Sequence, residues 1–178
     1  MREKPPSPSL WSRLRRIAVH RWMDETDTAR ALDAAALARL ETRVAASETR
    51  HSGEIRLCVE AGLPLSYLWR NATSRQRAVT MFGKLRVWDT EHNNGVLIYL
   101  LLAEHAIEIV ADRGVARMVP QAHWDGLLGT MREAFRAGRF EDGLAGAVDA
   151  VDAMLAQHFA LAQGQTNPNE LPDGADLR

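Results

Sequence analysis

The sequence predicts an α/β fold, a layered structure in which helices pack on a small mixed sheet. Segments whose apolar residues recur every three or four positions alternate with short apolar segments typical of strands, which favours a layered structure over a helical bundle. The chain has 178 residues, of which 46% are hydrophobic, so it can bury one core of ordinary size. Two neighbouring apolar segments, 96–102 and 106–110, are separated by only a short turn, which predicts an antiparallel hairpin.

The first part of the chain is predicted to contain one basic amphipathic helix. Residues 1–8 are charged and rich in proline, which is typical of a disordered N-terminus. Ser9 can cap a helix that runs to about Met23, and residues 9–30 are expected to form this helix and a linker. One face of the helix carries Trp11, Leu14, Ala18 and Trp22. We expect this apolar face to pack on the domain and the arginines to face water. The alternative is a basic arm that contacts a membrane or RNA.

The main domain is predicted to span residues 31–162. Its expected elements are, in order, a helix from Asp33 to about His51, a strand over 54–60, a helix over 68–85, strands over 96–102 and 106–110, a helix from Pro120 to Gly138, and a last helix over 140–159. The first two strands are joined through a helix, so we expect them to be parallel with a right-handed crossover. The tail, 163–178, is polar and contains glycine and proline, and it is predicted to be disordered.

The predicted hairpin brings polar residues from its two ends together. Asn94 directly precedes the second strand and Asp112 directly follows the third. Glu54, at the start of a parallel first strand, joins the same edge. Carboxylate and amide oxygens suit a hard cation such as Ca²⁺ or Mg²⁺, whereas an arginine here could hold a phosphate or carboxylate group. The candidate cation ligands are Glu54, Asp89, Asn94 and Asp112, with Glu91 nearby, and the candidate anion-binding residue is Arg113.

The same residues also fit a purely structural interpretation. Asn-Asn-Gly is an ordinary turn before a strand, because Asn and Gly tolerate positive φ. Asp112 and Arg113 could form only an exposed ion pair, worth ~0–1 kcal/mol. Binding sites in open α/β sheets favour the carboxyl ends of parallel strands, whereas this edge is the amino end of both.

Other kinds of site find little support in the sequence. The single cysteine, Cys58, excludes an internal disulfide and a multi-cysteine zinc site, and its position in an expected strand favours a buried residue. There is no Gly-rich phosphate loop, no Gly-x-Ser-x-Gly elbow and no His-x-x-x-His pair. The formal net charge is −1, so nothing global points to nucleic acid or acidic lipid.

Several segments together resemble the TPM domain family. They are "LARLETRVAASETRHSGEIRLCVE", "RAVTMFGKLRVWD", "HNNGVLIYLLLAEHAIEIVADRGV" and "FRAGRFEDGLAGAVDAVDAML". The resemblance covers about Asp33 to Phe159, and its specific features include Gly53-Glu54, Asn94-Gly95-Val96 and Asp112-Arg113-Gly114. No single motif is decisive, but their order and spacing are fairly specific. Where other members have a Gly-rich approach to the second strand, this chain reads "VWDTEHNNG", which adds Asp89 and Glu91.

The resemblance implies an α/β/α sandwich and two competing functions. Phosphatase activity and divalent-cation binding are associated with some members of the family, while many have no established activity. The first expectation is therefore a domain that binds Ca²⁺ or Mg²⁺, with phosphatase activity as an option. The alternative is a non-enzymatic interaction module that assists membrane-protein assembly or repair. The candidate ligand residues are those named above.

The location and the partners follow from what the sequence lacks. The N-terminal segment has no apolar core of a signal peptide, and no window approaches the ~18 apolar residues of a membrane span. We therefore expect a soluble, cytoplasmic protein without a transmembrane segment. We also expect a monomer that has no nucleic-acid partner. A protein partner at a membrane is possible.

Overall fold

The computed structural model describes residues 9–23, 25–162 and 164–178. Its elements are α1 (Leu10–Trp22), α2 (Glu25–Ala31), α3 (Ala34–Glu48), β1 (Ile55–Glu60), α4 (Leu65–Trp69), α5 (Ser74–Lys84), β2 (Val96–Leu101), the 3₁₀ helix η1 (Leu102–Glu104), β3 (Ala106–Ala111), α6 (Arg113–Met118), α7 (Gln121–Arg136), α8 (Phe140–His158) and β4 (Asp176–Leu177). Residues 1–8, for which we predict disorder, lie outside the described residues.

The strands form one mixed sheet with the order β3-β2-β1-β4. Strands β1 and β2 are parallel from Ile55↔Val96 to Glu60↔Leu101, as expected from the helical connection between them. Strands β2 and β3 are antiparallel from Val96↔Ala111 to Leu101↔Ala106, which confirms the hairpin. The turn is completed by η1 and by His105, whose φ of 46° lies in the left-handed region.

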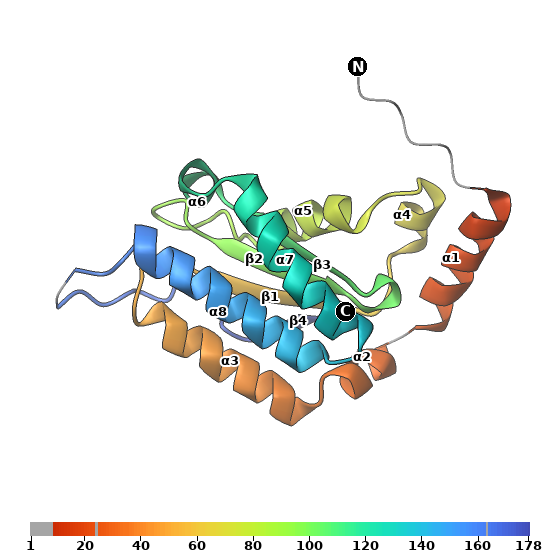
Figure 1. The fold of residues 1–178 in the computed structure, drawn as a ribbon, viewed down its shortest axis with the longest axis horizontal. Helices are drawn as coiled ribbons and strands as arrows, with labels where there is room; N and C mark the ends of the chain where they lie inside the picture. Colours follow the sequence, from red (N-terminus) through yellow and green to blue (C-terminus); the bar gives the residue numbers. More distant parts are fainter. Residues whose placement is uncertain (1–8, 24, 163) are drawn as a thin grey trace, which may run out of the picture.

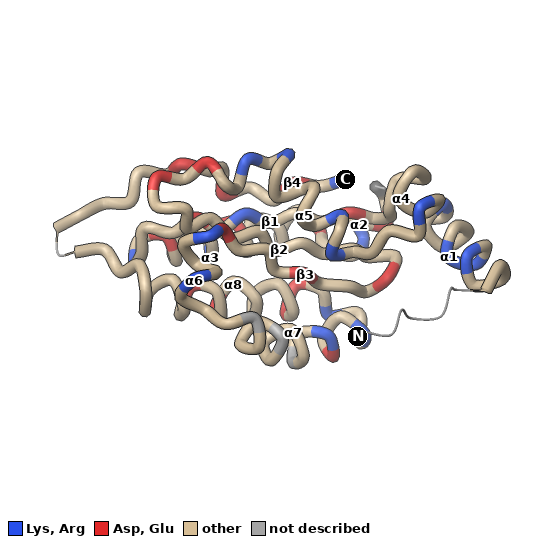
Figure 2. The backbone as a smooth tube through the Cα atoms, turned by 90° about the horizontal axis from the view of Figure 1, so that it is seen from above, with Lys and Arg blue, Asp and Glu red and all other residues tan. Residues whose placement is uncertain are grey.

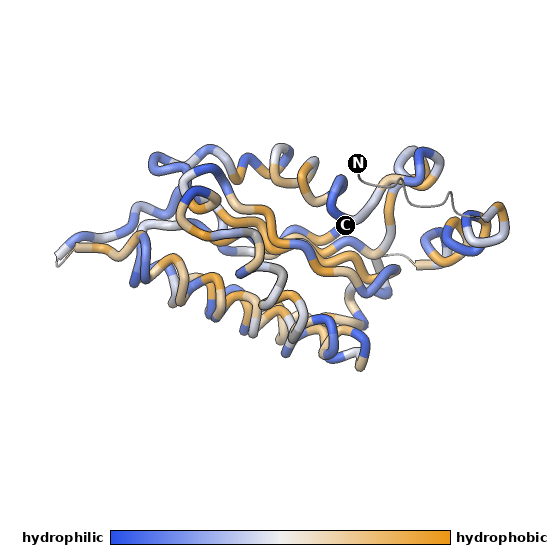
Figure 3. The backbone as a smooth tube through the Cα atoms, turned by 45° about the horizontal axis from the view of Figure 1, so that its top comes forward, coloured by the Kyte–Doolittle hydropathy of each residue, from blue (hydrophilic) through white to orange (hydrophobic). Residues whose placement is uncertain are grey.

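Helices cover both faces of the sheet and make the predicted three layers (Figure 1). Alternate strand residues point to opposite sides. Leu57, Ile98 and Ile109 pack against α3, α7 and α8, whereas Leu97 and Tyr99 pack against α5. Figure 3 shows the three long strands as a hydrophobic band between the helices. The continuous apolar stretch of β2 therefore reflects burial on both faces.

Side-chain caps explain where several helices begin. Asp33 accepts a hydrogen bond from the Ala36 amide at 2.7 Å, as its N-cap role predicts. Thr73 and Gln76 form a capping box at the start of α5. Because α5 starts there, the helix predicted over 68–85 is in fact two helices, and Asn71, with φ of 53°, lies in the turn between them. That part of the prediction was wrong.

The orientation of α1 is opposite to the prediction. Trp11, Leu14 and Trp22 were expected on the domain, but their side chains face away from it and are 82%, 58% and 88% exposed. The helix is attached instead through Arg16 and His20, which both contact Glu104, at 2.7 and 3.0 Å. Helical spacing identifies an apolar face but not the side on which the domain lies.

The tail also differs from the prediction, because residues 164–178 have a defined path. Strand β4 pairs with β1 through Cys58↔Asp176 and Val59↔Leu177. The Arg56 guanidinium donates to the carbonyl oxygens of Pro172 and Gly174. A polar segment is held here by hydrogen bonds to a sheet edge, which its own composition does not reveal.

No helix in the described part of the chain combines the length and the apolar character needed to cross a membrane.

Candidate functional site

The hairpin places Asn94 and Asp112 at one edge of the sheet, on either side of Gly95. The Asp112 amide donates to the Gly95 carbonyl oxygen at 2.9 Å, which continues the β2–β3 ladder by one step. Asn94 is fully buried and Asp112 is 5% exposed. The predicted meeting of these two residues is therefore confirmed, whereas their role as cation ligands stays a prediction.

One carboxylate oxygen of Asp112 accepts a hydrogen bond and the other does not. Its Oδ1 accepts a hydrogen bond from the Arg113 amide at 2.6 Å and caps α6. Its Oδ2 is buried and has no hydrogen-bond partner among the described residues. The structural interpretation of Asp112-Arg113-Gly114 is the close of the hairpin, and the structure shows that this segment also begins the short helix α6.

Asn94 shows the same pattern. Its Nδ2 donates to the carbonyl oxygen of Ser52 at 2.9 Å and to its hydroxyl at 3.2 Å. The Asn94 amide donates to Thr90 Oγ1 at 3.1 Å. Its Oδ1 is buried without a hydrogen-bond partner within the described ranges. Two oxygens of the kind that hard cations prefer are thus unsatisfied at one edge.

Glu54 lies at the same edge, but its carboxylate has other partners. The Glu54 carbonyl accepts from the Val96 amide at 2.8 Å, which fixes the start of β1 beside the start of β2. Its Oε1 accepts from Asn167 Nδ2 at 2.9 Å and its Oε2 from the Leu171 amide at 3.2 Å. Burial raises the pKa of this carboxyl, and the hydrogen bonds from the tail oppose that rise.

A second buried carboxyl, Glu48, stands next to Glu54 and was not expected from the sequence. Its Oε1 accepts from the Ile55 amide at 3.0 Å. Burial raises the pKa of Glu48 to about 8, the hydrogen bond from Ile55 opposes the rise, and the negative charges of Glu54 and Asp173 add to it. The only sequence signal was its place in the last turn of a helix directly before a strand.

Asp89 and Arg113 lie on the surface around this edge. Asp89 forms an ion pair with Arg86 at 2.7 Å, with a half-exposed carboxylate. The Arg113 side chain is 81% exposed, and its Nε lies 4.0 Å from Asp112 Oδ1. Within the described residues the structure gathers no group of three or more acidic, histidine or cysteine side chains that could hold a metal. The four predicted ligands therefore do not form one compact acidic cluster.

A cavity of about 430 Å³ borders this edge, between the tail and the loop before β2. Its lining includes Ser52, Glu91, His92, Asn167 and Glu170. Ser52 bonds Asn94 and Asn167 bonds Glu54, so the cavity touches the partners of both residues. The tail supplies one wall, which sequence reasoning missed because it predicted a disordered tail.

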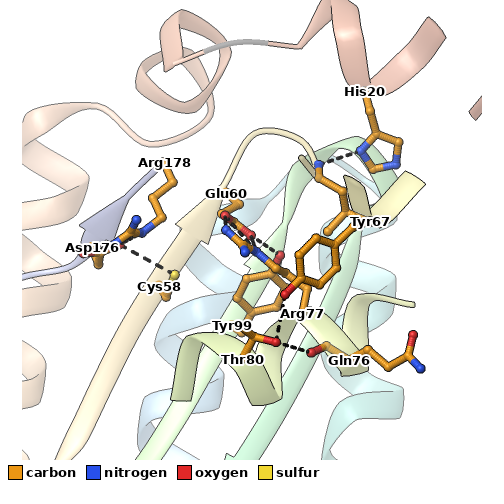
Figure 4. A network of polar contacts seen from close by, with 11 residues as sticks. His20, Cys58, Glu60, Tyr67, Gln76, Arg77, Thr80, Tyr99, Asp176 and Arg178 are labelled. Carbon is orange, nitrogen blue, oxygen red and sulfur yellow. Dashed lines mark hydrogen bonds and ion pairs between the residues drawn. The ribbon is translucent and has the colours of Figure 1, made fainter. Parts of the chain in front are cut away.

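The opposite end of the sheet carries a buried polar network that the sequence did not suggest (Figure 4). The Arg77 guanidinium on α5 forms an ion pair with Glu60 at the end of β1, with Nε 2.8 Å from Oε2. The Tyr99 hydroxyl donates to the same carboxylate at 2.6 Å. Arg77 also stacks over the Tyr67 ring, 4.9 Å from its centre. Arg77 lies with Ala78 and Met81 on the buried face of α5.

A cleft of about 660 Å³ lies beside this network, at the carboxyl ends of β1 and β4. Arg21, His20 and Arg178 line it together with Glu60 and Arg77. Most of these charges are already paired: Arg178 with Asp176 at 2.5 Å, and Arg77 with Glu60. Two of the buried oxygens that have no hydrogen-bond partner among the described residues, Asn94 Oδ1 and Asp112 Oδ2, lie instead at the amino end, which makes that edge the stronger candidate.

A family model and two solved structures are similar to most of this chain. The family model described as the TPM domain matches residues 26–154. The NMR structure of BA42 from the psychrophilic bacterium Bizionia argentinensis is 25% identical, with a TM-score of 0.72, over 83% of this chain and 95% of that one. The N-terminal domain of a P. gingivalis protein, also solved by NMR, is 18% identical with a TM-score of 0.59, over 79% and 95% of the two chains. No curated protein sequence matches this chain.

Proposed function

The chain belongs to the TPM domain family, and we propose that it binds a divalent cation, Ca²⁺ or Mg²⁺, at the amino end of the β2–β3 hairpin. Asn94 and Asp112 provide the side-chain ligands. The observation that carries the proposal is the pair of buried oxygens, Asn94 Oδ1 and Asp112 Oδ2, that have no hydrogen-bond partner among the described residues.

The energetic argument is that such atoms need a partner. A buried oxygen without a hydrogen bond costs roughly 1–3 kcal/mol, and more when it belongs to a charged group. An ordered water or a cation can remove this cost. Both oxygens are hard ligands, and one of them belongs to a carboxylate, which favours Ca²⁺ or Mg²⁺ over softer metals. Their buried position reduces screening by solvent.

Glu54 and Asp89 belong to the same proposal in secondary roles. Both Glu54 oxygens accept hydrogen bonds from the tail, which take up part of their capacity to bind a cation. Asp89 is paired with Arg86 and half-exposed, so it contributes long-range attraction from the surface. A cation would thus compete with the tail for the edge of the sheet.

Phosphatase activity is the further part of the proposal. Arg113 stands directly beside Asp112 and is 81% exposed, so its guanidinium is free to hold a phosphate group from solvent. A bound cation would act on the same phosphate as a Lewis acid. The test is hydrolysis of p-nitrophenyl phosphate by the full chain with Mg²⁺ or Ca²⁺. We expect Arg113→Gln to raise KM. Absence of turnover in the wild type would rule out phosphatase activity.

The cation itself is tested by Asp112→Asn. Asparagine caps helices as well as aspartate, so α6 should remain intact. At a hundredfold excess of cation over its Kd, binding should stabilise the wild type by ~2.7 kcal/mol, and the variant should lose most of that gain. The measurement is thermal melting with excess Ca²⁺ or Mg²⁺ and again with chelator.

The matched control is Asp149→Asn, an exposed carboxylate on α8 that is paired with Arg43 at the surface and lies outside the proposed site. It should keep most of the cation-dependent shift in melting temperature. A wild type that melts alike with cation and with chelator would rule out the site. Equal shifts in the wild type and in Asp112→Asn would remove Asp112 from it.

A non-enzymatic interaction module is the second candidate function, with the cation structural at most. The observation that favours it is the exposed tryptophan-bearing face of α1. Melting shifts without phosphatase turnover would leave this second function, a module that assists membrane-protein assembly or repair. The cytoplasmic location and the monomeric state stay predictions, to be tested by cell fractionation and light scattering.

A further inference from the structure

We propose that α1 and α4 form a binding surface for membranes that carry acidic lipids. The surface, here called the tryptophan face, consists of exposed apolar residues on the two helices: Leu10, Trp11, Leu14, Leu65, Trp69 and Trp22. Trp11, Trp22 and Trp69 are 82%, 88% and 77% exposed. Single exposed apolar residues are common on proteins, but such a group of large ones marks an interaction surface.

The exposure is fixed by how α1 is attached. The opposite side of the helix holds the domain largely through polar contacts, in which Arg16 and His20 bond Glu104. The Leu63 amide also donates to Nδ1 of His20, which Figure 4 labels, at 2.9 Å. The Arg13 guanidinium donates to the Trp69 carbonyl oxygen at 3.0 Å, which brings α4 beside α1. Ile17 adds an apolar contact with the core on the docked side, whereas the tryptophan-bearing side of the helix is free.

The charges around the tryptophan face are positive. Residues 10–22 include four arginines and no acidic residue. At 100° per residue, Arg15 and Arg21 flank the stripe that runs from Leu14 to Trp22, and Arg21 lies between Leu14 and Leu10. Neither forms an ion pair with any residue that the structure describes. Figure 2 shows the basic residues of α1 gathered at one end of the molecule.

An acidic membrane surface fits this combination better than other occupants. A helix with tryptophan and leucine on one side and arginine at the borders is typical of segments that lie in the plane of the bilayer interface. Tryptophan is enriched at that interface, and the flanking arginines can reach anionic headgroups. A second copy packed on the same face would bring the bordering arginines of both copies together, which electrostatics opposes.

The position of α1 in the molecule allows this contact. The helix lies at one end, beyond the sheet, in both Figure 1 and Figure 2. The Asn94–Asp112 edge lies at the amino ends of β1 and β2, whereas α1 docks near Glu104 and Leu63 at their carboxyl ends. A membrane contact through α1 therefore leaves the proposed cation site open. The proposal does not depend on cation binding.

The test uses the full chain and lipid vesicles. Vesicles of phosphatidylcholine with a quarter phosphatidylglycerol are compared with pure phosphatidylcholine, in chelator, by co-sedimentation and tryptophan fluorescence. We expect binding and a blue shift with the acidic vesicles, both weakened by added salt. The Trp11→Ser/Trp22→Ser variant should lose at least tenfold in affinity. Arg15→Gln/Arg21→Gln should lose about fivefold for each arginine removed.

The matched control is Trp88→Ser, which removes a half-exposed tryptophan outside the tryptophan face and should bind as the wild type does. Melting curves check that every variant is folded. Absence of binding to acidic vesicles at low salt would overturn the proposal, and so would equal binding to both kinds of vesicle. Concentration-dependent dimers that Trp11→Ser/Trp22→Ser abolishes would assign the face to self-association instead.

Discussion

Gly95 shows how the lack of one side chain positions the candidate site. A Cβ built on Gly95 would stand 2.0 Å from the Val87 carbonyl oxygen, and a backbone atom cannot move aside easily. The loop that ends α5 can therefore pass close to the start of β2 only because residue 95 is glycine. This close approach sets the backbone between Asn94 and Val96. The Asn-Gly pair thus has a packing reason besides the turn chemistry that the sequence suggested.

Gly95→Ala should therefore destabilise the protein by about 3 kcal/mol, the upper end of overpacking costs. Urea unfolding followed by circular dichroism measures this change. The control is Gly83→Ala in α5, where a Cβ meets nothing within 4 Å and should stabilise the helix by up to ~1 kcal/mol. Similar stabilities for wild type and Gly95→Ala would mean that Val87 and Gly95 are less closely packed.

At the scale of elements, the attachment of α5 to the sheet depends on one buried charge pair. Arg77 and Glu60 have side chains that are 6% and 3% exposed, and the Tyr99 hydroxyl adds a third group from β2. Hydrogen bonding to Glu60 raises the pKa of Arg77 further, so the guanidinium stays charged. The network joins a helix, the end of β1 and the middle of β2 across otherwise apolar layers.

Arg77→Met should cost about 3–5 kcal/mol, because it leaves the Glu60 carboxylate buried without its cation. The double variant Arg77→Met/Glu60→Gln should recover part of that loss, since no unpaired charge remains. Arg43→Met, which breaks the exposed pair with Asp149, should cost at most ~1 kcal/mol. Chemical denaturation of the wild type and the three variants measures these costs. A cost for Arg77→Met no larger than the Arg43→Met cost would contradict a buried pair.

At the scale of the whole molecule, the stability should depend on pH through Glu48. In the unfolded chain this carboxyl has an ordinary pKa of 4.5, and in the folded protein burial raises the pKa to about 8. Between these values the folded state holds a proton that the unfolded state has lost, so stability falls as pH rises. Burial lowers the pKa of His51. Below pH 6.5 the unfolded chain therefore holds a proton that the folded protein lacks, so this group makes stability rise with pH in that range.

Glu48→Gln removes the first of these titrations. The variant should match the wild type at pH 5, where the folded carboxyl is protonated, and should exceed it at pH 8 by a few kcal/mol at most. Melting temperatures from pH 5 to 8 give the comparison. Glu133→Gln, an exposed position on α7, should follow the wild type throughout. A constant difference between Glu48→Gln and wild type across this range would refute the assignment.

The sequence by itself determined the elements whose signals are local. Two apolar segments with a short turn between them allow only a hairpin, and this hairpin brought Asn94 and Asp112 to one edge as predicted. Alternation and helical spacing likewise determined the layers. The period at which apolar residues recur depends on the type of element and on how many of its faces are buried.

Only the tertiary structure decided which face of α1 is free, where the tail runs and which carboxyl groups accept hydrogen bonds. Trp11 and Trp22 form an apolar stripe in either orientation, and the contacts of Arg16 and His20 with Glu104, more than eighty residues away, decide between them. The tail is held by hydrogen bonds from Arg56 and to Glu54, which no periodicity records. These outcomes depend on pairs of residues distant in sequence, whereas local patterns report only whether a segment can be buried.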